Sequence, residues 1–444
     1  MNAQNLGIYR FVRGIRSGLR LRHVMVLSSL MSSLAVGSER ELVILTTFSR
    51  EPLLPLIEEF TRQYEGVDVQ IVHRRAQSSV QLLNKSYINN IDLVLSSSPY
   101  LMQQLAESGR LAILPERFQT PDWLHSFVLP PTNKVVTIGY SGAGVTWNKD
   151  YLAAHHLPTP KTFADLANPV FFGHVTMSTP ARSGTTQLMV ESVLKKYGWE
   201  AGWRLLMNVG ANLGTVSSRS FGVSDYIARG QFGAGPTIDS YALILERKFP
   251  HVSFVYDDAF TLMPTYVAQV SQKQNDVYAK AFIDLLMSKG VQANMDANDF
   301  SKHGVNDDSL FSDSFTRLSM ATMMRREECM NLLFDLAITK RLPALKDTWL
   351  MIINAREQFK SKPEVLARLQ QIERSLFSVP ITESALDGVI NSIYPLADEQ
   401  DTELQANKAM LLAKLSHEWK KQLEVSLNRA NADIKQLLRE SGQC

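Results

Sequence analysis

Cysteine is scarce in this chain of 444 residues, and its scarcity excludes two classes of small stabilised domain. Only Cys329 and Cys444 occur, with no CxxC motif and no cluster of cysteine and histidine. A disulfide framework or a structural zinc site needs more such residues at closer spacing. The two cysteines could pair in an oxidising compartment or remain free thiols, because a sequence gives no geometry for the bond.

An excess of charge of either sign is also missing. The formal net charge is +2 and charged residues make up 20% of the chain, which excludes a general polycation for nucleic acid. Glycine almost vanishes after Ser319, where only Gly388 and Gly442 remain. Leucine, alanine, lysine, glutamate and glutamine dominate there instead. The chain is long enough for two or three units, and this change of composition predicts a helical C-terminal one over residues 319–444.

Long apolar runs are lacking, and no stretch after the N-terminus is apolar enough to predict a transmembrane helix. Residues 24–36 form a short apolar run, residues 35–38 are small, and no acidic residue precedes Glu39. This pattern predicts a secretory signal peptide over residues 1–38 and a mature protein outside the cytoplasm, with an uncleaved membrane anchor as the alternative. The basic region in front of the apolar run contains Arg10, Arg13, Arg16, Arg20 and Arg22.

Enzyme signatures are lacking as well. Residues 139–143 approach the nucleophile motif G-x-S-x-G, but the last glycine is replaced by Ala143. Residues 142–144 lack the third glycine of a dinucleotide fingerprint, and there is no Walker A loop. An extracellular hydrolase using Ser141 or Ser183 would need a histidine base that no motif supplies. The sequence therefore predicts no catalytic residue, no cofactor and no metal site.

What is present is an alternation of strands and helices up to about residue 290. Strands are predicted at residues 41–47, 67–72, 91–95, 135–140, 172–177, 252–256 and 266–270, and helices lie between most of them. Such alternation indicates an α/β protein with a mostly parallel sheet. Ligands of open α/β sheets bind beyond the carboxyl ends of the strands.

Loops that combine hydroxyl groups with arginine recur at these strand ends. Residues 178–186 contain Arg182 and several hydroxyls just before a predicted helix, whose first N–H groups lack internal partners. Residues 46–50 and 215–220 repeat the combination with Arg50 and Arg219, and residues 96–98 are all serines. Any one loop could be an ordinary helix cap, but their recurrence favours a shared site for an oxyanion such as phosphate or carboxylate.

The order of several degenerate motifs between about residues 40 and 310 carries a resemblance. The most specific block is Pro180-x-x-Ser183-Gly184-Thr185, followed by Tyr197-Gly198-Trp199-Glu200-x-Gly202-Trp203. Residues 144–150, Asn168-Pro169 and residues 279–286 add to it. The chain resembles the bacterial periplasmic solute-binding proteins of the ferric-iron and phosphate-ester cluster.

That resemblance implies a two-lobe clamp of type II in the periplasm, followed by an all-helical C-terminal extension. Residues 39–140 with 265–318 would form the first α/β lobe, and residues 141–264 the second. An anion bound between the lobes would close the hinge, because only the closed form contacts it from both sides.

The resemblance also bears on the ligand and the partner. Iron binders of this cluster typically use adjacent tyrosines near the position of Asp239-Ser240-Tyr241, where this chain has only Tyr241. The helical tail is similar to that of regulatory members that sense phosphoglycerate and signal through a membrane sensor. The alternative is the delivery subunit of an ABC importer, with a permease as its partner. The ligand contacts expected here are Thr47, Ser49, Arg50, Ser97, Arg182, Ser183, Gly184, Thr185, Arg219 and Asp239.

The last predicted helix, roughly residues 401–440, carries an apolar stripe opposite a charged face. Packing on the preceding domain and docking of a partner both explain such a stripe. Its members are Leu404, Leu411, Leu415, Trp419, Leu423, Leu427 and Ile434.

Overall fold

A computed structural model describes residues 40–74, 79, 91–118, 120–130, 132–270, 276–295, 301–308, 314–393 and 402–441. The expected signal peptide and Cys444 lie outside the described residues. Residues 41–444 form one compact unit. Within the described ranges, no helix has the length and hydropathy needed to cross a membrane. Cys329 is a buried thiol.

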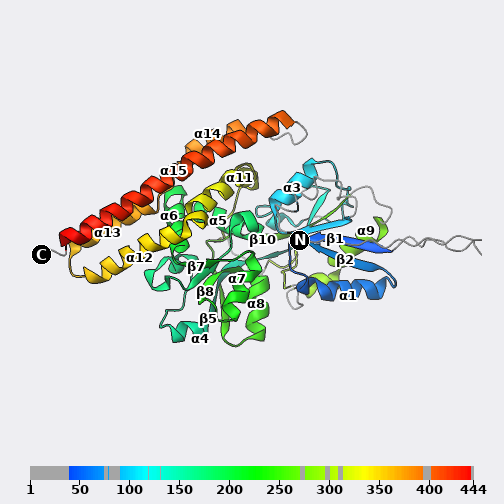
Figure 1. The fold of residues 1–444 in the computed structure, drawn as a ribbon. Coiled ribbons are helices and arrows are strands. Elements are labelled where there is room, and N and C mark those ends of the chain that lie inside the picture. Colours follow the sequence, from blue (N-terminus) through cyan, green and yellow to red (C-terminus); the bar gives the residue numbers. More distant parts are fainter. Residues whose placement is uncertain are drawn as a thin grey trace, which may run out of the picture. The chain divides into compact units, whose positions relative to one another are not determined.

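The first sheet has the strand order β2-β1-β3-β10-β4. Figure 1 labels β1, β2 and β10 of this sheet. One face packs on α1 and α9, where the Phe60 and Phe282 rings meet at 5.2 Å, and the other face packs on α3. We call this sheet and its helices the first α/β half. Its elements are β1 (Glu41–Thr46), η1 (Glu51–Leu53), α1 (Leu54–Gln63), β2 (Asp68–His73), β3 (Leu93–Ser96), α3 (Pro99–Glu107), η3 (Asp122–Leu124), β4 (Val135–Ser141), β10 (Met263–Gln269), α9 (Asp276–Leu286) and α10 (Lys289–Ala293).

The second sheet has the order β7-β6-β8-β5-β9 and, with its helices, forms the second α/β half. Helix α5 is buried along most of its length and packs against α6, η6 and α11 (Met320–Ala337). The elements are β5 (Ala143–Asn148), α4 (Lys149–Ala154), η4 (Phe163–Ala167), η5 (Pro169–Phe171), β6 (Val175–Met177), η6 (Pro180–Arg182), α5 (Gly184–Tyr197), α6 (Trp199–Ala211), β7 (Leu213–Val216), α7 (Ser220–Ala228), β8 (Ala234–Ile238), α8 (Asp239–Lys248) and β9 (Val252–Tyr256).

Both sheets are mixed, so the expectation of a mostly parallel sheet is wrong. Strand β1 pairs in parallel with β2 and β3, but β10 is antiparallel to β3 and β4. In the second sheet β6 is parallel to β7 and β8, whereas β5 is antiparallel to β8 and β9. The reason is that β5 and β10 are the strands by which the chain enters each sheet from the other one, and they run against their new neighbours.

The direct passage from β4 to β5 is made at Gly142. A side chain there would place its Cβ 2.5 Å from the Tyr256 ring, so the close approach requires glycine. The Gly142 N–H donates to the Asp239 carboxylate at 2.7 Å, and the Tyr256 hydroxyl donates to the same oxygen. Asp239 also lies 3.0 Å from the His303 ring. This carboxylate therefore fixes the crossing between the two halves.

The C-terminal extension, Met320–Ser441 here, is entirely helical where it is described and lies along the second α/β half (Figure 1). Ile338 enters the surface of α6 at Gly210, and the Trp349 indole N–H donates to Asn212 at 2.7 Å. The extension shares one continuous apolar core with both halves. Its elements are α11 (Met320–Ala337), η7 (Thr339–Arg341), α12 (Leu342–Gln358), α13 (Pro363–Leu376), α14 (Glu383–Ile393) and α15 (Thr402–Ser441).

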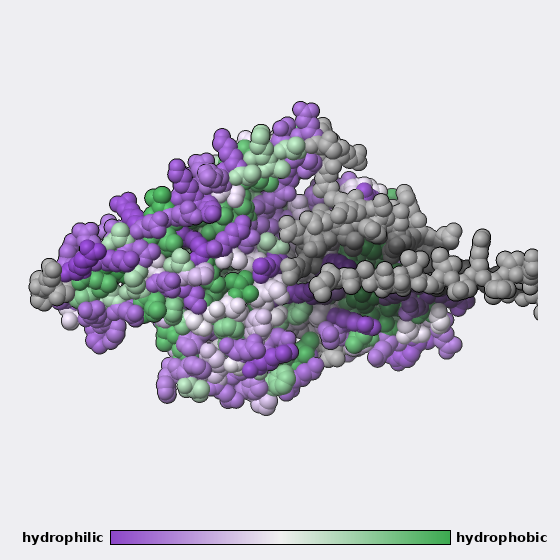
Figure 2. Space-filling view, in the orientation of Figure 1, coloured by the Kyte–Doolittle hydropathy of each residue, from purple (hydrophilic) through white to green (hydrophobic). Residues whose placement is uncertain are grey.

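Helix α15 buries its apolar stripe inside this extension. Trp419, Leu423, Leu427 and Ile434 are buried, and α15 packs against α11, α12 and α13. Hydrophilic side chains cover most of its outward face (Figure 2). The packing interpretation therefore holds for this part of the stripe, although the partners are the other C-terminal helices rather than the α/β halves directly.

Candidate functional site

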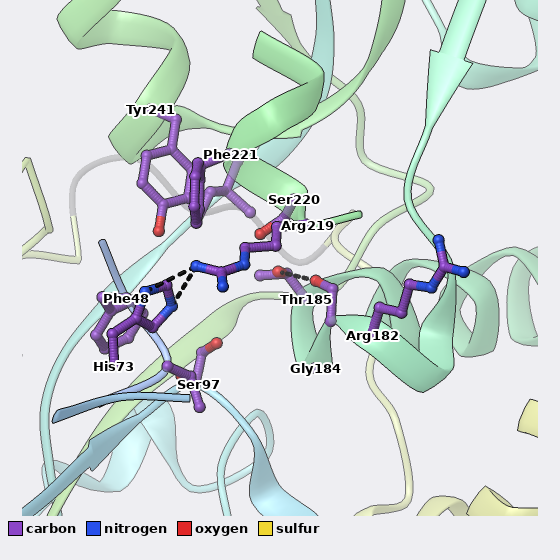
Figure 3. A pocket seen from close by; sticks show the side chains of 13 residues that line it. Phe48, His73, Ser97, Arg182, Gly184, Thr185, Arg219, Ser220, Phe221 and Tyr241 are labelled. Carbon is purple, nitrogen blue, oxygen red and sulfur yellow. Dashed lines mark hydrogen bonds between the residues drawn. The ribbon is translucent and has the colours of Figure 1, made fainter. Parts of the chain in front are cut away.

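A small cavity lies where the carboxyl ends of strands from the two sheets face each other (Figure 3). Three of the chain segments that line it lie at or after the ends of β1, β2 and β3, which run parallel to one another. Three more lie at or after the ends of β6, β7 and β8. The cavity volume is about 30 Å³. Its lining consists of Thr47, Phe48, His73, Ser97, Arg182, Ser183, Gly184, Thr185, Arg219, Ser220, Phe221, Ile238 and Tyr241.

The first α/β half supplies hydroxyls and one imidazole to the cavity. The Thr47 hydroxyl lies 2.9 Å from that of Ser96, and the backbone N–H of Phe48 donates to Thr46. The first contact holds the turn after β1 against the end of β3, and the second lies within the turn itself. His73, the last residue of β2, completes this wall.

The second α/β half supplies the N-terminus of α5. Ser183 is the N-cap residue, and its hydroxyl accepts from the Thr186 N–H at 3.2 Å and lies 2.8 Å from the Thr185 hydroxyl. The remaining N–H groups of the first turn, together with the helix dipole, favour a negative charge in front of the helix. At Gly184 the helix start touches the first α/β half, since an added Cβ would lie 3.0 Å from the Ser98 Cβ.

Arg219, the N-cap of α7, reaches across the cavity (Figure 3). Its guanidinium donates to the His73 ring, 2.8 Å away, and lies over the Phe221 ring at 5.5 Å. Burial lowers the pKa of His73, and the positive charge of Arg219 lowers it further. His73 is therefore neutral at pH 7 and can accept the hydrogen bond.

Tyr241 closes the cavity from α8. Its ring packs 5.8 Å from that of Phe221. Burial raises the pKa of the Tyr241 phenol, and hydrogen bonding with Ser49 opposes that rise. The phenol is therefore protonated at neutral pH, and it offers the cavity a neutral polar group.

These groups together suit an oxyanion. Arg219 brings a full positive charge, α5 a helix N-terminus, and the loops several hydroxyl donors. Arg182 also lines the cavity, but its guanidinium points away from the other residues (Figure 3). The arrangement can therefore make charge-assisted hydrogen bonds to a small anion.

Sequence comparison identifies the family. The profile of the bacterial extracellular solute-binding proteins matches residues 89–323, more than half of the chain. The chain belongs to that family. The phosphoglycerate transport regulatory protein PgtC of Salmonella typhimurium is 36% identical to this solute-binding protein over 344 residues, which cover 75% of this chain and 86% of PgtC. The same-named protein of Salmonella typhi matches equally well.

Solved structures show that the fold of this solute-binding protein is that of periplasmic binding proteins. The periplasmic binding protein P5PA matches with a TM-score of 0.56 and 20% identity, over 68% of this chain and 98% of its own. AfuA from Actinobacillus pleuropneumoniae, with fructose-6-phosphate bound, gives 0.55 and 16%, over 70% and 97%. Iron-bound HitA from Pseudomonas aeruginosa gives 0.53 and 15%, over 66% and 98%.

These matches confirm the resemblance stated from the sequence, including its regulatory branch, and the predicted fold of two α/β parts followed by a helical extension. They also confirm a binding protein rather than an enzyme. The hydrolase alternative fails on the same ground.

Three of the ten expected contacts lie outside the cavity of this solute-binding protein. Asp239 is fully buried at the β4–β5 crossing, Ser49 lies behind the wall beside Tyr241, and Arg50 is exposed at the start of η1. The other seven line the cavity together: Thr47, Ser97, Arg182, Ser183, Gly184, Thr185 and Arg219.

Sequence reasoning missed the aromatic and imidazole part of the lining. His73 directly follows the strand predicted at residues 67–72, and the expected hydroxyls also lie at the ends of predicted strands, so the same positional signal could have found it. Phe48 and Phe221 lie directly beside polar residues that were selected, but a single aromatic residue in a loop carries no signal of its own. Tyr241 was noted only as a possible iron ligand.

Proposed function

We propose that this solute-binding protein binds a small phosphorylated carboxylic acid, phosphoglycerate in the first place, between its two α/β halves. Binding would report the solute to a membrane sensor that induces its transporter. The ligand class and the role follow the name of the PgtC relative, which is 36% identical.

One observation carries the proposal: loops from both halves converge on one cavity. Seven residues selected for anion chemistry meet there, although they come from four separate loops. Charge-assisted hydrogen bonds contribute about 1.5–3 kcal/mol each, so a few of them, less the loss of freedom on binding, support micromolar affinity.

The size of the cavity argues for a clamp. The cavity is small, with a volume of about 30 Å³, so a phosphorylated three-carbon acid would fit it tightly. Separation of the halves, or movement of Arg219 away from His73, would give the ligand room to enter. We propose residues 39–140 with 265–318 and residues 141–264 as the moving lobes, in a protein exported to the periplasm by the signal peptide at residues 1–38.

A thermal-shift panel tests the ligand class. The panel contains 3-phosphoglycerate, 2-phosphoglycerate, phosphoenolpyruvate, inorganic phosphate and ferric citrate. A ligand at 100 times its dissociation constant stabilises the folded state by about 2.7 kcal/mol, which is visible as a higher melting temperature. We expect the phosphoglycerates to raise it. A rise with ferric citrate alone would overturn the proposal in favour of iron.

Substrate delivery to an ABC importer is the second candidate. It is favoured by the fold shared with sugar-phosphate-bound AfuA and iron-bound HitA. Reconstitution separates the two roles. A delivery protein supports ATP-driven uptake of phosphoglycerate by a permease into vesicles, whereas a sensor changes the activity of a membrane kinase when loaded.

A further inference from the structure

Helix α5 begins at the cavity and carries a buried carboxylate about two turns further on. Glu191 is 1% exposed, in a helix whose residues 185–194 are all buried. A charge at such a position is unfavourable unless it is paired and hydrogen-bonded. Its partner therefore decides what α5 is fixed to.

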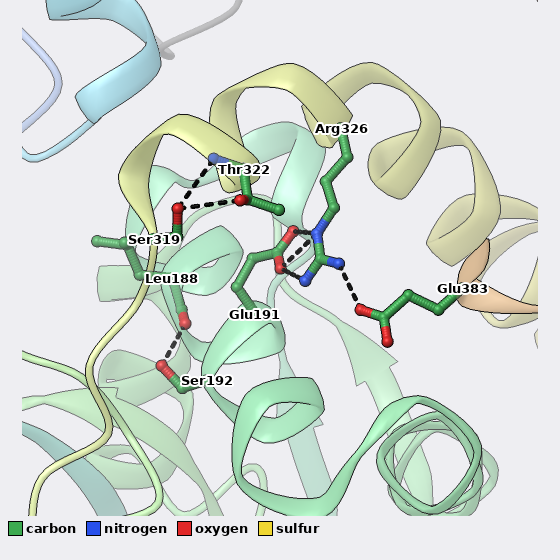
Figure 4. Close-up of polar contacts among 7 residues, drawn as sticks. All are labelled: Leu188, Glu191, Ser192, Ser319, Thr322, Arg326 and Glu383. Carbon is green, nitrogen blue, oxygen red and sulfur yellow. Dashed lines mark hydrogen bonds and ion pairs between the residues drawn. The ribbon is translucent and has the colours of Figure 1, made fainter. Parts of the chain in front are cut away.

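That partner comes from the C-terminal extension. The Arg326 Nε of α11 donates to both Glu191 oxygens, at 2.9 and 3.2 Å, and its Nη2 contacts the same carboxylate (Figure 4). The Arg326 Nη1 lies 3.0 Å from Glu383, the first residue of α14. Burial raises the pKa of Glu191, and the Arg326 charge opposes that rise. The guanidinium of Arg326 in α11 thus joins α5 to α14.

The neighbouring residues of α11 extend these links. The Arg325 guanidinium donates to Asn391 of α14 at 2.6 Å. Glu328 pairs with Lys408 of α15 at 2.8 Å. A single turn of α11 is therefore bonded to α5, α14 and α15 at once.

Helix α11 also touches both sides of the cavity. It packs against η6, which carries Arg182, and against α3, which follows the cavity residue Ser97. These two elements belong to opposite α/β halves. Because the Arg326–Glu191 pair fixes α11 to the second half, any separation of the halves changes the packing of α11 on α3.

We propose that α11 couples the proposed anion site to the other helices of the C-terminal extension, α14 and α15, with Arg326 as the positioning residue that holds α5 through Glu191. Closure of the halves packs α3 on α11, and α11 transmits this contact to α14 and the first part of α15. The inference rests on the proposed clamp. Because coupling between two sites is reciprocal, the docked extension raises affinity for the anion by the same factor as the anion stabilises the docking.

A purely structural pair would behave differently. Buried ion pairs often contribute little net stability. If the pair were purely structural, hydrogen exchange in α14 and α15 would not depend on the distance between the halves. The coupling role requires that closing the halves, with or without a ligand, changes these helices.

A disulfide staple tests this without a ligand. Ser98→Cys with Gly184→Cys joins the halves close to the arrangement seen here. An ideal Cβ at position 184 lies 3.0 Å from the Ser98 Cβ, and a shift of less than about 1 Å reaches the roughly 3.8 Å that a disulfide requires. Hydrogen exchange of the full chain is then compared in its oxidised and reduced forms. We expect oxidation to slow exchange in α11, α14 and the first part of α15 by about fivefold or more. Slowing confined to the loops around the cavity would overturn the inference.

Two variants in the stapled background sharpen the result. Arg326→Met should abolish the slowing in α14, and Arg326→Lys should restore part of it. Arg368→Met is the matched control, because Arg368 pairs with Glu440 within the extension at 2.8 Å and does not contact α5. Coupling that survives Arg326→Met contradicts the assigned residue. Failure of phosphoglycerate to bind, with the staple still slowing exchange, refutes only the proposed ligand.

Discussion

The Arg219 guanidinium of the second α/β half donates a hydrogen bond to the His73 ring of the first, across 2.8 Å. Arg219 follows β7, His73 is the last residue of β2, and both side chains line the cavity. The bond is weaker than one to an anion, because the neutral ring carries no negative charge. Under the proposed function, an incoming phosphate or carboxylate would replace His73 as the partner of Arg219.

Arg219→Ala should weaken phosphoglycerate binding by about 10- to 100-fold, the equivalent of one or two charge-assisted hydrogen bonds. Isothermal titration calorimetry measures the change. Arg229→Ala is the matched control, since Arg229 is exposed and pairs only with Asp225 in the described structure. Equal affinities of the two variants would remove Arg219 from the site.

Gly184→Ala should reduce affinity about tenfold, because the added Cβ lies 3.0 Å from the Ser98 Cβ and holds the halves apart. Stability without ligand should stay the same or rise slightly, since alanine favours the helix. Titration calorimetry and thermal melting measure the two effects. Gly290→Ala, which meets no atom within 4 Å, should change neither property. Unchanged affinity in Gly184→Ala would show that the halves need not approach this closely.

Glu327 of α11 makes stability depend on pH. Burial raises the pKa of its carboxyl to about 8, so the native state holds a proton that the unfolded state releases at lower pH. The stabilising effect is complete below about pH 4.5 and is lost as pH rises through 8. Glu327→Gln stays neutral throughout. It should match the native protein near pH 5 and exceed it by about 2 kcal/mol or more at pH 8.5, at about 1.4 kcal/mol per pKa unit.

Chemical denaturation at several pH values measures this difference. The exposed Glu364→Gln should show no such trend. A constant difference between Glu327→Gln and the native protein from pH 5 to 8.5 would contradict the prediction.

Trp349→Phe should destabilise the protein by about 1–3 kcal/mol, because it leaves the Asn212 oxygen buried without its donor. Thermal melting followed by circular dichroism measures the loss. Leu350→Ala, at a half-exposed neighbouring position, is the control. A loss in Trp349→Phe no larger than in the control would mean that this contact between α6 and α12 adds nothing.

Seven of the ten residues expected at the site line one cavity, because the position of a loop after a strand is a local signal in the sequence. Parallel strands end at the same edge of a sheet, so loops that follow them, such as those of Thr47 and Ser183, come together there. The sequence could not separate Asp239 from these residues. A carboxylate at a strand end has the same local signal whether it faces a cavity or fixes a crossing between sheets.

Contacts between distant segments were beyond reach for a different reason. Glu191 and Arg326 are 135 residues apart, and the sequence around either residue gives no signal that the other is its partner. The mixed sheets were missed similarly, since the direction of β5 and β10 depends on which sheet the chain enters.

The shared apolar core affects how this chain folds during synthesis and how a truncated form behaves. Ile338 fills the groove that Gly210 leaves on α6, and the Trp349 indole bonds Asn212 behind it. During synthesis this surface stays exposed to solvent until the C-terminal extension, which begins at Met320, has been made. A shortened protein ending before α11 would keep every cavity residue but would expose the apolar surface that the extension covers. It should therefore self-associate rather than bind ligand as a stable monomer. The binding region and its helical tail therefore depend on each other to cover their apolar surfaces.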